Sequence, residues 1–135
     1  MLTLDDFTLH YGHSQILHGV SLAAKAGAVT CVMGTNGVGK TSLIRAICGQ
    51  HLRSGGRMVL DGEELPVMPA HRLAQKGVAV VPQGREIFPQ LTVRENMETG
   101  FSCLPKSEHH IPDELFDLFP VLKDFIDRRV GELSG

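Results

Sequence analysis

Residues 34–41 read Gly34-Thr35-Asn36-Gly37-Val38-Gly39-Lys40-Thr41, which fills every fixed position of the pattern G-x-x-x-x-G-K-[ST]. In this pattern the glycines let backbone N–H groups surround phosphate oxygens. The lysine adds a positive charge, and the final hydroxyl can bind Mg²⁺. A helix that follows such a loop also favours anions at its N-terminus. The stretch therefore predicts a phosphate-binding loop.

The residues on either side of the loop support this interpretation. Residues 28–33 are a short apolar run, which predicts a buried parallel strand. After the loop, Leu43, Ile44 and Ile47 have helical spacing, and Gly49 is a typical end for that helix. The order of strand, glycine-rich loop and helix favours an α/β fold over an incidental glycine-rich turn.

Antiparallel strands are predicted before and after this unit. Alternating apolar residues predict strands at residues 2–9 and 16–22, and the first is interrupted at Asp5-Asp6. Another strand is predicted at residues 57–60, followed by the turn signal Asp61-Gly62.

The second half of the chain has mainly helical signals. Thr92 and Glu95 have the spacing of a capping box, so a helix should begin at Val93. The other predicted elements are a helix at 69–76, a second buried strand at 77–82, a loop at 102–112, and a helical segment at 113–126 that is broken near Pro120.

Composition narrows the class of protein. The net charge of −2 gives no basic footprint for nucleic acid, so no nucleic-acid partner is expected. Cys31, Cys48 and Cys103 have no C-x-x-C spacing, and we expect reduced, buried thiols. The pair His109-His110 lies in a polar stretch and is expected in a solvated loop rather than at a metal. No apolar run approaches the roughly 18 residues of a membrane span, and no signal peptide is evident.

Two further residues are open to two interpretations each. Tyr11 follows the first predicted strand, and its ring could stack on a nucleotide base or simply end the strand with its hydroxyl in water. Gln83 follows the predicted strand at 77–82, where ligands of open α/β sheets bind, so its amide could hold a metal or orient water. It could equally be an ordinary polar loop residue.

The motifs occur in an order that resembles a known family. Tyr11-Gly12, the loop at 34–41, Gln83 and the final Leu133-Ser134-Gly135 together resemble the ATP-binding subunit of ABC transporters, over the whole chain. Residues 81–89, Val-Pro-Gln-Gly-Arg-Glu-Ile-Phe-Pro, are most similar to the urea type within the branched-chain amino acid and urea uptake branch.

The resemblance implies a role for each matching residue, with ATP and Mg²⁺ as ligands. Tyr11 would stack on adenine, and Lys40 would contact the β- and γ-phosphates. Gln83 would contact Mg²⁺ or the attacking water, and Leu133-Ser134-Gly135 would open the signature motif, which faces ATP held by a partner subunit. The residues expected to surround the phosphates and Mg²⁺ are Asn36, Gly37, Val38, Gly39, Lys40, Thr41 and Ser42.

The resemblance also implies an architecture and partners. We expect an α/β P-loop NTPase core with a parallel sheet at 29–49 and 66–92, an antiparallel region at 1–28 and 57–65, and the start of a helical subdomain at 93–135. The family continues with an Asp-Glu strand after the signature, so the chain is expected to be the N-terminal portion of a subunit and inactive alone. The expected partners are permease subunits and a second ATP-binding subunit in a head-to-tail dimer, at the cytoplasmic face of the inner membrane. The alternatives are a non-transport ATPase of the same family and a non-catalytic nucleotide-binding fragment.

Overall fold

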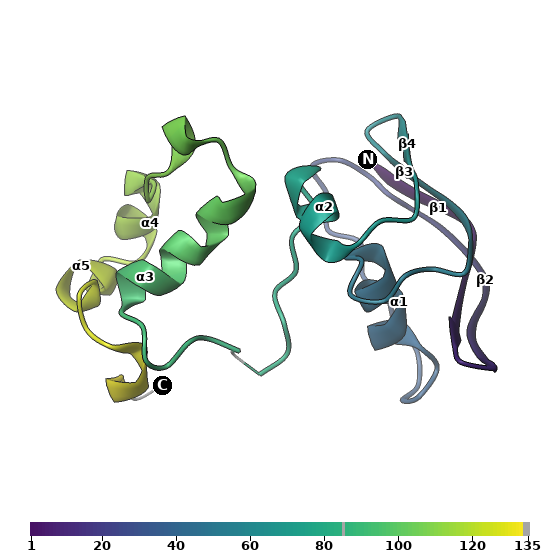
Figure 1. Ribbon diagram of the computed structural model, residues 1–135, viewed down its shortest axis with the longest axis horizontal. Helices are drawn as coiled ribbons and strands as arrows, with labels where there is room; N and C mark the ends of the chain where they lie inside the picture. The colour runs from purple at the N-terminus through teal and green to yellow at the C-terminus, as the bar shows by residue number, and fades with distance from the viewer. Residues whose placement is uncertain (85, 134–135) are drawn as a thin grey trace. The chain divides into compact units, whose positions relative to one another are not determined.

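The computed structural model describes residues 1–84 and 86–133 (Figure 1). Arg85 and the last two residues of the expected signature, Ser134 and Gly135, lie outside the described residues. The chain divides into two compact units, Met1–Val80 and Val81–Gly135, and each is described by itself. The prediction that residues 66–92 share one core with the loop stays a prediction.

The first unit is built on an antiparallel sheet of four strands in the order β2-β1-β3-β4. This sheet confirms the strands predicted on both sides of the phosphate-binding loop. Asp61 and Gly62, with φ values of 49° and 87°, form the tight turn between β3 and β4. The strands are β1 Leu2–Tyr11, β2 Ser14–Ala24, β3 Gly55–Leu60 and β4 Glu63–Leu65.

A bulge in β1 explains the interruption seen in its sequence. Asp6 has a φ of 47°, and the register against β2 shifts between Leu4 and Phe7. The extra residue changes the alternation, so that Leu4 and Phe7, three positions apart, are both buried. The bulge is accommodated by a glycine on each neighbouring strand, Gly19 in β2 and Gly56 in β3.

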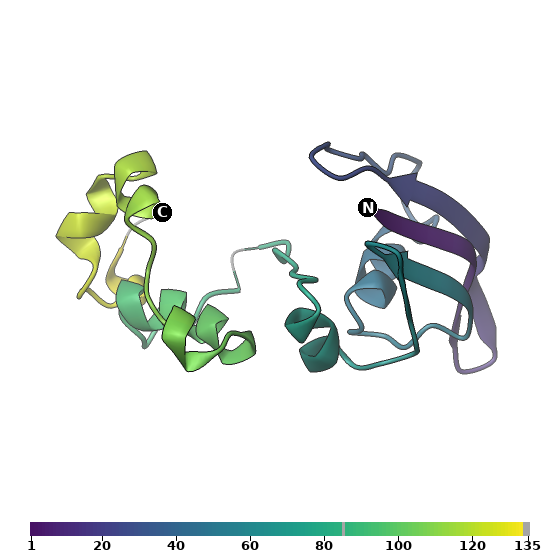
Figure 2. The ribbon, with the colours of Figure 1, turned by 90° about the horizontal axis from the view of Figure 1, so that it is seen from above.

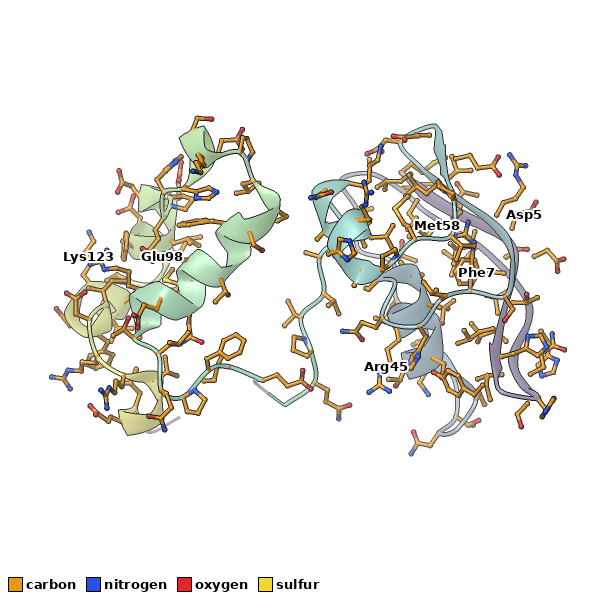
Figure 3. The ribbon with its side chains drawn as sticks, in the orientation of Figure 1. Asp5, Phe7, Arg45, Met58, Glu98 and Lys123 are labelled. Atoms are coloured by element: carbon orange, nitrogen blue, oxygen red, sulfur yellow. The ribbon has the colours of Figure 1, made fainter. Side chains whose placement is uncertain are left out.

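Two helices, α1 (Lys40–Ile47) and α2 (Ala70–Gln75), lie on the same face of this sheet (Figures 1 and 2). Figure 3 shows Phe7 and Met58 on the side of the sheet that faces the helices, and Asp5 on the opposite side. Both helices end close to where they were predicted to end. The buried core consists of Leu4, Phe7, Leu9, Leu17, Leu43, Ala46, Met58, Leu65 and Leu73.

The parallel strands predicted at 28–33 and 77–82 are not strands in the structure. Instead of being buried, Val29, Met33 and Val81 are 99%, 85% and 95% exposed. A strand exists only where a neighbour supplies ladder hydrogen bonds, and β1 to β4 pair with one another rather than with these segments. Both runs are apolar in sequence, but no described strand pairs with either of them. The expectation of a buried Cys31 is wrong for the same reason, whereas Cys48 is buried.

The second unit is helical. The capping box at α3 is confirmed: the Glu95 N–H donates to Thr92 Oγ1 at 3.2 Å, and the Thr92 N–H donates to Glu95 Oε2 at 2.8 Å. The helices of this unit are α3 Val93–Glu98, α4 Asp113–Leu118 and α5 Val121–Phe125, with short 3₁₀ turns at Thr99–Cys103, Lys106–Glu108 and Val130–Glu132.

The predicted apolar face at 113–126 is only partly buried. The helix is broken at Pro120 as expected, but Leu118 and Phe119 beside the break are exposed, while Leu122 and Phe125 are half-buried. No helix in the described part of the chain is long and apolar enough to cross a membrane.

Candidate nucleotide-binding site

The phosphate-binding loop owes its curvature to glycines. Gly37 and Gly39 have φ values of 84° and 97°, in the left-handed region that residues with a Cβ rarely adopt. Gly39 is also the N-cap of α1, and its carbonyl accepts the first helical bond from the Leu43 N–H at 2.8 Å. Among the described residues, no side chain caps this helix, so the first N–H groups of α1 stay available to a ligand.

Gly39 also has to be small because it lies against β2. A Cβ at Gly39 would stand 3.1 Å from a methyl carbon of Leu17 and 3.5 Å from the Ile16 carbonyl oxygen. Gly37 is different, since no described atom would lie within 4 Å of a Cβ there. The end of the loop is therefore fixed against the sheet, whereas its middle has open space.

Lys40 holds the loop closed through the loop's own backbone. Its Nζ donates to the carbonyl oxygens of Gly34 at 2.8 Å and Thr35 at 2.6 Å. The described residues give it no ion pair with a carboxylate, so its positive charge is balanced only by carbonyl dipoles. An anion at the loop would offer the ammonium group a stronger partner.

Tyr11 is brought to the start of α1. Its hydroxyl donates to Ser42 Oγ at 3.4 Å, across 31 residues of sequence. Its ring packs against His51, with a centroid separation of 4.8 Å and an interplanar angle of 59°. Tyr11 is still 39% exposed. This placement favours the interpretation of Tyr11 as part of the nucleotide site over that of an isolated residue at the end of a strand.

The remaining predicted site residues are not all brought together. Asn36, Val38 and Thr41 are exposed on or beside the loop in the first unit. Gln83 is exposed near the start of the second unit, and Leu133 is half-buried near its end. The structure thus groups Tyr11, Ser42 and the loop, and places Gln83 and Leu133 in the other unit.

The described residues offer few oxygen ligands for a Mg²⁺ ion at the loop. In proteins this ion is usually held by one or two carboxylates together with substrate phosphates. Thr41 can supply one hydroxyl oxygen beside the loop. Within the residues that the structure describes, no group of three or more His, Cys, Asp or Glu side chains is arranged to hold a metal ion. Roles for Thr41 and Gln83 toward Mg²⁺ stay predictions.

Two residues were not singled out from the sequence. His51 contacts Tyr11 only because the chain after α1 turns back toward β1, and no local pattern signals that contact. Asn96 lies in the first turns of α3, and its side chain bonds backbone groups of residues before the helix. Its only signal in the sequence is that it directly follows Glu95 of the capping box.

Comparison with known proteins identifies the family of the chain. The ABC transporter family matches residues 17–135 of the chain. The high-affinity branched-chain amino acid transport ATP-binding protein BraG of Pseudomonas aeruginosa is 38% identical over 136 aligned residues, which cover 100% of this chain and 58% of BraG. The probable branched-chain amino acid transport ATP-binding protein LivF of Archaeoglobus fulgidus is 35% identical, over 93% of this chain and 53% of LivF.

Solved structures show the same fold. The ADP conformation of MJ1267, an ATP-binding cassette of an ABC transporter, superposes with a TM-score of 0.73 and 25% identity, over 100% of this chain and 59% of that one. The chain thus spans somewhat more than half the length of the relatives it matches. The predicted fold class is confirmed as the ABC ATPase fold, and the chain belongs to the ABC transporter ATP-binding family.

Proposed function

We propose that this chain is the nucleotide-binding part of a subunit that uses ATP hydrolysis to energise ABC-type uptake of branched-chain amino acids or urea. The observation that carries the proposal is the loop at 34–41, where Lys40 and the uncapped start of α1 converge on a glycine-lined turn. The names of two relatives support branched-chain amino acids. The run at 81–89 is the support for urea.

In this proposal the chain's own residues bind and orient ATP. The Lys40 ammonium exchanges the Gly34 and Thr35 carbonyls for phosphate oxygens, which carry full charge. The Tyr11 ring stacks on the base, while its bond to Ser42 links the base end of the site to the phosphate end. Bound Mg²⁺ would neutralise charge on the phosphates beside the Thr41 hydroxyl.

Hydrolysis also needs a group that orients the attacking water. We assign this role in part to Gln83. The signature that begins at Leu133 would contact ATP held by a second subunit. Because Gln83 would supply only part of this water-orienting role, residues 1–135 by themselves are expected to be inactive. The working assembly is a head-to-tail pair of ATP-binding subunits on permease subunits, at the cytoplasmic face of the membrane.

A complementation experiment tests the proposal. The gene is deleted in its own organism, and uptake of radiolabelled urea and leucine is compared with that of the parent. We expect loss of one of the two uptakes, restored by the intact gene and not by the Lys40→Ala gene. A Lys25→Ala gene is the matched control, because Lys25 is an exposed lysine away from the loop. Unchanged uptake of both solutes, or full rescue by Lys40→Ala, would overturn the proposal.

A further inference from the structure

The side chain of Asn96 forms hydrogen bonds with both backbone polar groups of Phe88. The Phe88 N–H donates to Asn96 Oδ1 at 2.9 Å, and Asn96 Nδ2 donates to the Phe88 carbonyl at 3.0 Å. The same Nδ2 donates to the Thr92 carbonyl at 2.9 Å. One half-buried amide thus fixes the chain at both ends of residues 88–92. This is a larger role than the usual helix-surface asparagine has, because asparagine more often bonds its own neighbours.

The segment that Asn96 fixes is in turn bonded to residues 126–131. This pairing joins two parts of the second unit that are more than 30 residues apart, and it includes a bridge between Thr92 and Arg129. The backbone bonds are Gly131 N–H to Pro89 O at 2.9 Å, Val130 N–H to Leu91 O at 3.0 Å, Val93 N–H to Arg128 O at 2.9 Å and Arg94 N–H to Ile126 O at 2.8 Å.

Gly131 closes this pairing at its tightest point. A Cβ at Gly131 would stand 2.9 Å from the Pro89 carbonyl oxygen, closer than such atoms normally approach. Two residues further on, the Leu133 N–H donates to the Val130 carbonyl at 3.1 Å. Hydrogen bonds and the peptide chain together therefore connect Asn96 through Phe88 and Pro89 to Gly131, and on to Leu133.

We propose that Asn96 is a positioning residue that sets the placement of Leu133, the first residue of the stretch expected to face a partner's nucleotide, through the pairing of 88–94 with 126–131. The inference rests on the proposed function, since that function gives Leu133 its role. The Asn96 amide holds Phe88 by two hydrogen bonds, and the carbonyl of the next residue, Pro89, accepts from the Gly131 N–H. Leu133 follows Gly131 by two residues. Any change that loosens one end of this path should loosen the other.

The test approaches the path from both ends in the 135-residue chain without nucleotide, by residue-level amide hydrogen exchange. Asn96→Asp keeps the side-chain shape and the oxygen that accepts from Phe88, but it removes the donations to the carbonyls of Phe88, Leu91 and Thr92. We expect about a tenfold loss of protection at Gly131 and Leu133. Gly131→Ala forces Pro89 away, and we expect a comparable loss at Phe88.

Two controls separate positioning from general loosening. Gly100→Ala is the matched glycine variant, because no described atom lies within 4 Å of a Cβ there, and it should change none of these amides. The Phe119 amide, bonded to the Leu115 carbonyl at 2.9 Å away from the path, should keep its protection in every variant. In Asn96→Asp, protection should partly return below about pH 4, because a protonated carboxyl can again donate to a carbonyl.

The inference is overturned if Asn96→Asp leaves Leu133 protected, if Gly131→Ala leaves Phe88 protected, or if Phe119 loses protection to the same extent as Leu133. The last result would mean that Asn96 only supports the stability of the unit. Because exchange is measured without nucleotide, a failure here leaves the uptake result of the proposed function untouched. Conversely, unchanged uptake would reject that function without altering the exchange pattern.

Discussion

Replacing Gly56 by alanine tests the contact that lets β1 bulge at Asp6. Gly56 has a φ of 79°, and a Cβ on it would overlap the Asp6 carbonyl oxygen and stand 2.7 Å from the Asp5 carbonyl oxygen. Both are backbone atoms of a central strand, so neither can rotate away as a side chain would. The substitution must therefore displace β1 or β3, and with it the buried Phe7 and Met58.

The size of the effect follows from two contributions. A left-handed φ costs a residue with a Cβ about 1–2 kcal/mol. Overlap in a packed region adds about 1–3 kcal/mol. We therefore expect Gly56→Ala to lower the free energy of unfolding by roughly 3 kcal/mol, partly offset by the lower entropy of the unfolded alanine chain. Gly62→Ala is the matched control, because Gly62, in the turn between β3 and β4, has a φ of 87° but no described atom within 4 Å of a Cβ. It should lose only about 1 kcal/mol.

Urea denaturation followed by circular dichroism measures both variants. The curves are recorded at two protein concentrations, so that self-association does not distort the comparison. Equal losses in Gly56→Ala and Gly62→Ala would refute the reasoning, because backbone strain alone would then account for the glycine. A loss at Gly56 without any change in the sheet signal would also contradict it.

Three further predictions concern the capping box, the exposed apolar runs and the loop. Hydrogen bonds from the Thr92 backbone N–H and then its hydroxyl lower the pKa of Glu95, so its contribution to stability is complete above its unfolded pKa and is lost as pH falls through the folded value. Between about pH 5 and about pH 3, the urea midpoint of the parent should fall more than that of Glu95→Gln, and parallel curves would contradict this. The exposed apolar run at 28–33 is expected to make the chain self-associate, so Val29→Lys should reduce association in sedimentation, whereas Val67→Lys, at another exposed valine, should not. Phosphate release from ATP should be no faster for the chain than for Lys40→Ala, and Lys40-dependent turnover would place every catalytic group within residues 1–135.

Elements with local causes could be predicted from the sequence. The capping box needs only Thr92 and Glu95, and the turn before β4 needs only Asp61-Gly62. Even the bulge left a local trace, because Asp5-Asp6 interrupts an otherwise apolar alternation. In each case the residues that make the structure are neighbours in the chain, so their identities are sufficient.

Elements that depend on contacts with distant residues could not be predicted from the sequence. The apolar runs at 28–33 and 77–82 have strand composition, but ladder partners decide whether a strand forms, and composition does not reveal them. The bond between Tyr11 and Ser42 and the grip of Asn96 on Phe88 also depend on chain paths that no local pattern specifies. Motif order identified the family, but it did not identify these contacts.

The two glycines of the loop have different physical reasons, and this bears on how the site would bind. Gly39 is required by β2, which lies too close for a side chain, so the end of the loop is set by the fold and not by a ligand. Gly37 has its left-handed φ with open space around it, which is the room that a phosphate needs. Because Lys40 already bonds the loop carbonyls, an anion has only to replace those partners, and the loop does not have to fold around it. Binding at such a preformed site loses little backbone entropy, so its strength depends mainly on how well the anion competes with the carbonyls of Gly34 and Thr35.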